Sequence, residues 1–179
     1  MHARFPTGFS LIEVLVAVLL LSIGILCAAA SQVASLRTRQ GTGLMANGVQ
    51  LASTLAERMR ANRAQVPAYL QLQYDAAVQG APTPGALCFG GARCTGEQMA
   101  AFDTYDIKQA LYTSFPGGRV VVCRDEGRAV AVWECTGGSA SPVVIKLGWR
   151  GKRADGADDA NEAKQFAPSV ALVVGGAFP

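Results

Sequence analysis

Histidine is nearly absent from this 179-residue chain, because the only one is His2 at the N-terminal end. Without an imidazole elsewhere, neither a Ser-His-Asp triad nor a Cys-His pair can be assembled in the body of the chain. The sequence also lacks the Gly-x-x-x-x-Gly-Lys-Ser/Thr phosphate loop, and no Gly-x-Gly-x-x-Gly follows a strand-like stretch. An enzyme is therefore the least favoured class of function.

Metal-binding patterns are missing as well. No Cys-x-x-Cys pair occurs, so a zinc site would lack its usual ligand spacing. The acidic residues Asp155, Asp158, Asp159 and Glu162 could offer oxygen ligands to calcium, but their spacing does not follow the EF-hand pattern. We expect a solvated acidic loop at this place, and we expect neither a metal nor a cofactor.

The chain has no strong excess of charge of one sign. Sixteen Lys and Arg stand against 13 Asp and Glu, which gives a formal net charge of +3 and no argument for nucleic acid. The best basic group is Arg58, Arg60 and Arg63. We expect a solvated helix end there, where the helix dipole favours cations. A contact to a neighbouring subunit is a second possibility and a DNA phosphate contact a distant third.

One apolar run dominates the sequence that is present. It extends from Gly8 to Ala30 and, at about 1.5 Å per helical residue, is long enough to cross a bilayer. Arg4 precedes the run and no further basic residue occurs before Arg37, so the N-terminus is expected to stay cytoplasmic. Glu13 lies inside the run. A carboxylate there costs roughly 2–3 kcal/mol on insertion scales, unless it reaches the interface.

The residues around Glu13 form a recognisable motif. The order Gly8, Phe9, Ser10, Leu11, Ile12, Glu13 before a membrane-length run resembles the class III leader of type IV prepilins. A secretory signal peptide would instead be cut after the apolar run. The resemblance implies that residues 1–8 are a leader, that a prepilin peptidase cleaves between Gly8 and Phe9, and that the new amine of Phe9 is methylated. It also implies that Glu13 meets the Phe9 amine of a neighbouring subunit.

After the apolar run the helical pattern continues but becomes amphipathic. Residues 9–36 are predicted to be the transmembrane and assembly helix, and residues 37–66 its amphipathic continuation. One face is apolar, formed by Leu44, Leu51, Leu55 and Met59. Three glycines mark a candidate bend, Gly41, Gly43 and Gly48, and Pro67 follows the end of the helix.

The second half of this helix carries a more particular resemblance. The stretch Leu51–Arg63, LASTLAERMRANR, together with Ser35-Leu36-Arg37, is similar to the type IV pilus modification proteins, a group of minor pilins. The implied partners are other minor pilins, the major pilin, the prepilin peptidase, the inner-membrane assembly platform and, before assembly, membrane lipid. The implied location is the inner membrane, with a periplasmic C-terminal domain, and then the pilus fibre. Two alternatives stay open: a type II secretion pseudopilin, and a pilin specialised as an adhesin or DNA receptor.

Residues 67–179 are predicted to form the periplasmic antiparallel sheet domain. The stretch Ala64–Gly96 is interpreted as a loop-rich connection and Glu97–Ser114 as a helix. Valine-rich stretches predict a hairpin of Arg119–Arg124 and Ala129–Cys135, followed by strands at Val143–Trp149 and Ser169–Val174. Together with the long helix these strands give a pilin-like α+β fold.

Four cysteines follow the apolar run, whereas Cys27 lies inside it. An even number outside a membrane anchor suggests an oxidising compartment and two disulfides. Of three possible pairings we favour Cys88–Cys94 and Cys123–Cys135, because each closes a short loop. A tight hairpin would place Cys123 opposite a residue near Val130, so the second bridge requires a bulge or a longer loop.

Overall fold

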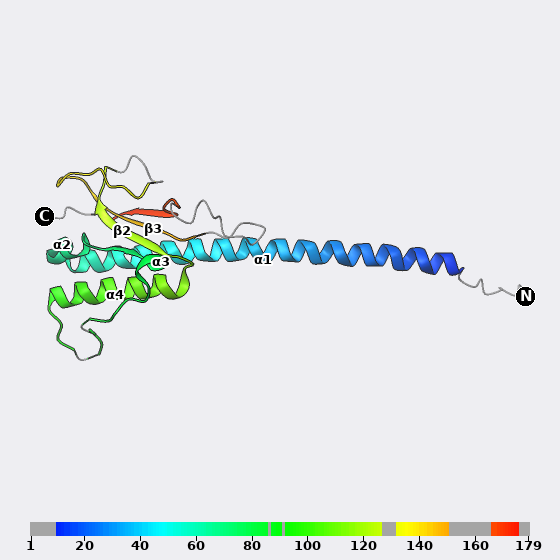
Figure 1. Ribbon diagram of the computed structural model, residues 1–179, viewed down its shortest axis with the longest axis horizontal. Helices are drawn as coiled ribbons and strands as arrows, with labels where there is room; N and C mark the ends of the chain where they lie inside the picture. The colour runs from blue at the N-terminus through cyan, green and yellow to red at the C-terminus, as the bar shows by residue number, and fades with distance from the viewer. Residues whose placement is uncertain (1–9, 86, 91, 127–131, 151–165, 176–179) are drawn as a thin grey trace, which may run out of the picture. The chain divides into compact units, whose positions relative to one another are not determined.

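The computed structural model describes residues 10–85, 87–90, 92–126, 132–150 and 166–175 (Figure 1). The chain divides into two compact units, Met1–Gly43 and Leu44–Pro179. The leader and Phe9 lie outside the described residues.

The apolar run forms a helix, as predicted. Helix α1 begins at Leu11 and ends at Ala61. Its segment Leu11–Val33 has a mean hydropathy of 2.8 and none of it is buried, and it is the one helix among the described residues that is long and apolar enough to cross a membrane. The helix is unbroken at Gly41, Gly43 and Gly48, so it does not melt there.

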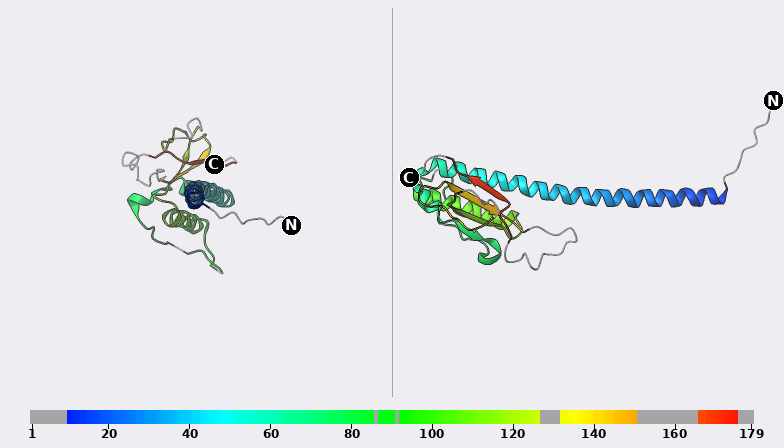
Figure 2. Two further views of the ribbon diagram at one scale, coloured as in Figure 1. Left: turned by 90° about the vertical axis from the view of Figure 1, so that its right-hand side faces the viewer. Right: turned by 90° about the horizontal axis from the view of Figure 1, so that it is seen from above.

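The second unit contains a four-stranded antiparallel sheet. Its strands are β1 (Gln73–Asp75), β2 (Arg119–Arg124), β3 (Val143–Gly148) and β4 (Val170–Val173), and they lie side by side in chain order. The helices of this unit besides α1 are η1 (Arg63–Gln65), α2 (Val66–Tyr69), α3 (Ala76–Gln79) and α4 (Gly96–Ser114). Figures 1 and 2 show the sheet on one side of this part of α1 and α4 on the other.

The core of this unit lies where the apolar face of α1 meets the sheet. Leu55 and Met59 of α1 are fully buried, and Leu44 and Leu51 pack against the same cluster. The sheet contributes buried aliphatic side chains, Val120, Val122, Val143, Ile145 and Leu147, and α4 contributes Ala100, Ile107 and Leu111. A long apolar helix on a four-stranded antiparallel sheet confirms the predicted pilin-like α+β fold.

Helix α4 matches its predicted bounds to within one residue. It begins with a capping box, in which the backbone N–H of Gln98 donates to the Thr95 hydroxyl and the Gln98 side chain accepts from the Thr95 N–H. It ends before Phe115, and Gly117, at φ 54°, turns the chain toward β2.

The predicted hairpin is wrong. Strand β2 pairs with β1 and β3, and the described part of the expected partner, Val132–Cys135, is not a strand. Ala129, Val130 and Ala131 lie outside the described residues. The pattern of valines marks a strand but does not choose its partner. The fully buried β3 pairs with all six residues of β2, whereas the carbonyls of Val132 and Glu134 accept from the ammonium of Lys146.

The connection Ala64–Gly96 is also more structured than predicted, because it holds η1, α2, β1 and α3. Strand β1 is only three residues long, and its one apolar side chain, Tyr74, is buried. Such a short segment has too few residues to show an alternating pattern.

The structure joins Cys88 to Cys94 and Cys123 to Cys135, the two pairs that the sequence favoured. Their Cα atoms lie 6.0 and 6.3 Å apart, inside the usual disulfide range. The geometric difficulty of the second pair disappears because the described residues Val132–Cys135 do not pair with β2 as a strand. Cys135 instead lies in an irregular segment that returns to the end of β2, where the Gly137 N–H donates to the Arg124 carbonyl.

Gly48 of α1 lies directly against the side chain of Trp149. A Cβ at this position would lie 2.5 Å from Cζ3 of Trp149, whose ring packs on Phe115. We expect Gly48→Ala to lower the free energy of unfolding by about 1–3 kcal/mol through overpacking. Gly43→Ala is the matched control, because nothing lies within 4 Å of a Cβ there. Thermal unfolding of the full chain in detergent measures both; equal midpoints for the two variants would contradict the prediction.

Candidate assembly helix

The only charged side chain of the apolar segment lies at its start. Helix α1 opens with the N–H groups of Glu13 and Val14 donating to the Ser10 carbonyl, and Glu13 occupies the first turn. A carboxylate near a helix N-terminus is favoured by the helix dipole. The Glu13 side chain is exposed, and among the described residues it has no ion-pair partner within the chain.

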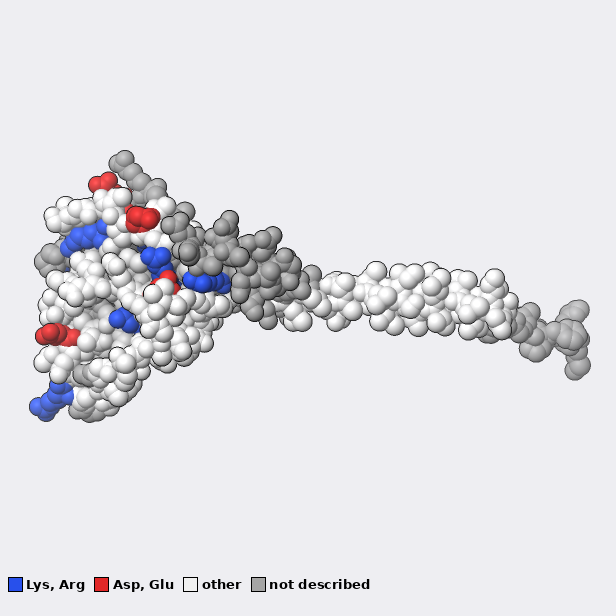
Figure 3. All heavy atoms as spheres, in the orientation of Figure 1, with Lys and Arg blue, Asp and Glu red and all other residues white. Residues whose placement is uncertain are grey.

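The rest of the segment offers a surface without charge. Between Leu11 and Val33 Glu13 is the only Asp, Glu, Lys, Arg or His, and the face in Figure 3 shows no Lys, Arg, Asp or Glu on this stretch. The hydroxyls of Ser22 and Ser31 donate to the carbonyls of Leu19 and Ala28, so the polar groups are satisfied within the helix. Such a helix can face lipid or other apolar helices.

The basic group at the C-terminal end of α1 does not form the solvated cluster that was expected. Arg58 bridges two carboxylates of α4: its Nη1 lies 3.2 Å from Oδ1 of Asp103, and its Nη2 lies 2.8 Å from Oδ2 of Asp106. Arg60 pairs with Glu57 at 2.7 Å. The two arginines therefore act within the chain, and Arg58 links α1 to α4.

Asp103 belongs to a buried network at this junction. Its Oδ2 accepts a hydrogen bond of 2.5 Å from the hydroxyl of Tyr69, which is fully buried. Asn62 donates to the Gly96 carbonyl at 2.7 Å. Burial, followed by the carboxylate of Asp103, raises the pKa of Tyr69 well above its ordinary value of 10, so the phenol stays a donor. The sequence signal for this site is a lone aspartate on the apolar face of α4, which sequence reasoning missed.

A comparison with models of protein families finds a similarity, which covers the middle of the chain. Residues 30–105 match the family model Tt1218-like, described as type IV pilin Tt1218. This part of the chain is therefore similar to type IV pilins, which are structural proteins and not enzymes, in agreement with the prediction that the chain is not an enzyme. No curated protein and no solved structure matches the chain.

The matched residues include Arg58, Tyr69 and Asp103 of the α1–α4 junction, whereas Asp106 lies just beyond them. They also include the apolar face of α1 that packs on the sheet. Gly8, Phe9 and Glu13 precede the matched residues, so their roles stay predictions. No group of three or more His, Cys, Asp or Glu side chains within the described residues could hold a metal.

A buried ion pair between Lys146 and Asp125 anchors the segment before β3. The ammonium of Lys146, 1% exposed, lies 2.5 Å from Oδ2 of Asp125 and donates to the carbonyls of Val132 and Glu134 at 3.0 and 2.6 Å. The Thr136 hydroxyl donates to the other oxygen of Asp125 at 3.1 Å. All three ammonium protons are thereby used, which is how a buried lysine is tolerated. In the sequence, the feature that could have predicted this ion pair is the single lysine among the apolar residues of β3.

This pair predicts a pH-dependent stability. The hydrogen bond from Lys146, assisted by Thr136, lowers the pKa of Asp125 from 3.8 to about 2. Because the folded-state pKa is depressed, the stabilisation is fully present above pH 3.8 and is lost as the pH falls toward 2, by about 2 kcal/mol in total. Thermal midpoints of the full chain between about pH 5 and pH 2 measure this. The thermal midpoint of an Asp125→Asn variant should fall less steeply with decreasing pH than that of the unchanged protein. If the two midpoints fell in parallel, Asp125 would not be the group responsible.

Two guanidinium groups stack on aromatic rings at one end of the sheet. Arg119 lies 4.5 Å from the ring centroid of Trp133, and Arg150 lies 5.8 Å from that of Phe166. The Trp133 indole N–H donates to the Phe166 carbonyl, and the two rings meet edge to face. A DNA-receptor or adhesin reading requires a basic and aromatic patch of this kind on the sheet. Here Arg119 and Arg150 already make cation–π contacts with these rings inside the chain, which does not favour that alternative.

Proposed function

We propose that this protein is a minor pilin of the type IV pilus, of the PilV kind, which is incorporated into the fibre and helps to initiate its assembly in a complex with other minor pilins. The observation that carries the proposal is the apolar, exposed segment Leu11–Val33 of α1, which has Glu13 as its single charged side chain and precedes most of a stretch similar to type IV pilins. The LAERMRANR stretch of α1 supports the minor-pilin identity.

The mechanism uses the apolar helix in two surroundings. Residues 9–36 first cross the inner membrane, with residues 67–179 in the periplasm. After the leader has been removed, the same side chains leave lipid and pack against equivalent helices of neighbouring pilins. Because both surroundings are apolar, hydrophobicity alone sets no register along the fibre. The carboxylate of Glu13 sets it by pairing with the methylated amine of Phe9 in the next subunit.

The mass and N-terminal residue of the protein recovered from sheared fibres test the proposal directly. We expect a chain that begins at N-methylated Phe9. Replacing Gly8 by a bulky residue such as Leu should leave a precursor that is heavier by the eight-residue leader, while Thr7→Ala serves as a control that should be trimmed. Fibre-borne protein that still begins with Met1 would overturn the proposal.

The remaining alternatives separate by phenotype. A type II secretion pseudopilin would share the N-terminal motif and the fold, and its deletion would abolish secretion and leave twitching intact. The minor-pilin proposal expects loss of twitching with secretion unchanged. A DNA-receptor or adhesin role predicts that Arg119→Gln reduces binding to DNA or to surfaces and leaves the number of pili unchanged.

A further inference from the structure

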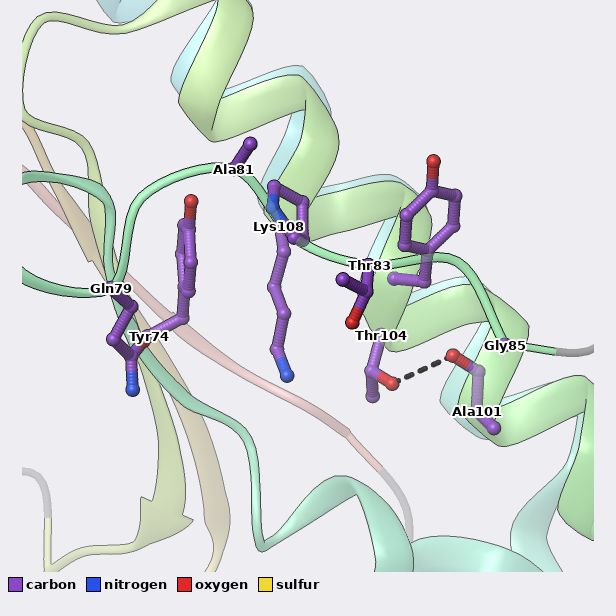
Figure 4. Close-up of a pocket in the computed structure, with 10 residues that line it drawn as sticks. Tyr74, Gln79, Ala81, Thr83, Gly85, Ala101, Thr104 and Lys108 are labelled. Atoms are coloured by element: carbon purple, nitrogen blue, oxygen red, sulfur yellow. Dashed lines mark hydrogen bonds between the residues drawn. The ribbon is translucent and has the colours of Figure 1, made fainter.

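A polar pocket lies between α4 and the chain that follows β1. Its volume is about 490 Å³, inside the range of pockets that hold small ligands. One wall consists of Tyr74 at β1, Gln79 at the end of α3 and the segment 81–83 with Gly85; the other is the face of α4 that carries Thr104, Tyr105 and Lys108. Figure 4 shows the Lys108 side chain running along this space, with its nitrogen ending between Tyr74 and Thr104.

The ammonium of Lys108 is the charge of the pocket. Within the part of the chain that the structure describes, it has neither an ion pair nor a hydrogen bond. The nearby carboxylates are engaged elsewhere: Asp106 pairs with Arg58, and Asp75 accepts from the Ala77 N–H. A half-buried cation without a partner favours an anionic ligand group, since a charge-assisted hydrogen bond is stronger than a neutral one.

The other polar groups of the pocket suit a ligand rich in hydroxyls. The Thr104 hydroxyl donates to the Ala101 carbonyl, which leaves its oxygen as an acceptor, and Gln79 accepts from the Asp75 N–H, which leaves its amide as a donor. The Tyr74 hydroxyl donates to the Gly80 carbonyl and thereby fixes its ring as part of the wall. The pocket therefore combines a hydrogen-bond donor, a hydrogen-bond acceptor and aromatic rings with one cation, Lys108.

We propose that this pocket binds an acidic sugar, with the sugar carboxylate on Lys108, the ring hydroxyls on Gln79 and Thr104, and the apolar face of the sugar against a tyrosine ring. An acidic peptide fits less well. A peptide would bring larger apolar side chains that need an apolar subsite. The apolar lining of this pocket is limited to Ala81, Pro82 and Ala101, and its remaining side chains are the hydroxyl, amide, aromatic and ammonium groups of Thr83, Thr104, Gln79, Tyr74, Tyr105 and Lys108.

The test compares two sugars of nearly the same shape. Methyl β-glucuronide and methyl β-glucoside differ in a carboxylate against a hydroxymethyl group, and their binding to the full chain in detergent can be measured by saturation-transfer NMR and calorimetry. We expect the glucuronide to bind roughly tenfold or more tightly, because a hydrogen bond to a charged group contributes about 1.5–3 kcal/mol. Lys108→Gln should remove this preference, and Thr104→Val should weaken the binding of both sugars.

Arg93→Gln is the matched control, because it removes one exposed positive charge that does not line the pocket, and it should leave the preference unchanged. Equal binding of the two sugars, or an unchanged preference in Lys108→Gln, would overturn the proposal. So would an acetylated aspartate peptide that binds as tightly as the glucuronide, because the site would then be a general carboxylate site. None of these results bears on assembly into the fibre, which the mass of fibre-borne protein tests independently.

Discussion

A Glu13→Val variant is expected to insert into the membrane and lose its leader normally, yet to be almost absent from sheared fibres. Valine suits a membrane helix at least as well as glutamate, so insertion has no reason to fail. In the proposed processing the leader is cut before Phe9, four residues ahead of Glu13, so cleavage should not need this carboxylate. Only the step at which the helix meets a second subunit should depend on the carboxylate.

The size of the expected effect follows from charge burial. In the proposed fibre the amine of Phe9 would lie among apolar helices, and loss of its partner would leave an uncompensated charge at a cost of about 3–5 kcal/mol. Incorporation should therefore fall by more than about a hundredfold. The measurement is an immunoblot of sheared fibres against the membrane fraction, with mass spectrometry of the membrane form to establish trimming.

Two control variants sharpen this experiment. Glu13→Asp keeps the charge and should retain part of the incorporation. Glu57→Val removes another glutamate, one whose side chain is 72% exposed and pairs only with the neighbouring Arg60, and it should leave incorporation unchanged. If the Glu13→Val protein entered fibres at the level of the Glu57→Val protein, register would not depend on this carboxylate.

Asp125→Asn is expected to be the most destabilising conservative change in the second unit. The variant keeps the shape of the side chain but leaves the Lys146 ammonium, 1% exposed, without a counter-charge. Removal of one partner of a buried pair costs about 3–5 kcal/mol. For a chain of this length the thermal midpoint should fall by roughly 10 °C. Glu126→Gln is the control, because the neighbouring Glu126 is exposed, and its midpoint should not change.

A double variant tests whether the stability lost in Asp125→Asn comes from the unbalanced charge of Lys146 or from its lost contacts. Replacing Lys146 by Met and Asp125 by Leu removes both charges and fills the space with apolar atoms, which is often nearly neutral for buried pairs. We expect it to recover most of the stability that Asp125→Asn loses. A double variant that is as unstable as the single one would show that the hydrogen bonds of Lys146 to the carbonyls of Val132 and Glu134, and not its charge balance, hold this segment.

The errors of sequence reasoning share one cause. The strand pattern of Arg119–Arg124 was found, but its neighbour was taken to be the next valine-rich stretch along the chain, whereas β3 is the partner. Arg58 was interpreted as part of a solvated helix end, although its carboxylate partner Asp103 lies 45 residues away. A pattern along the sequence carries no information about which distant element will cover it.

The sequence by itself determined the long apolar helix, the single carboxylate near its start and the fold class, because hydropathy and helical periodicity are properties of neighbouring residues. It favoured the two pairs of cysteines, and the structure decided between the three possible pairings. The tertiary structure alone decided the order of the strands and the charges that the core accepts. Lys146 and Asp103 can be buried only where the fold brings Asp125, Tyr69 and Arg58 within hydrogen-bond distance of them. Such distances depend on how the elements pack and are not encoded in any single stretch of the chain.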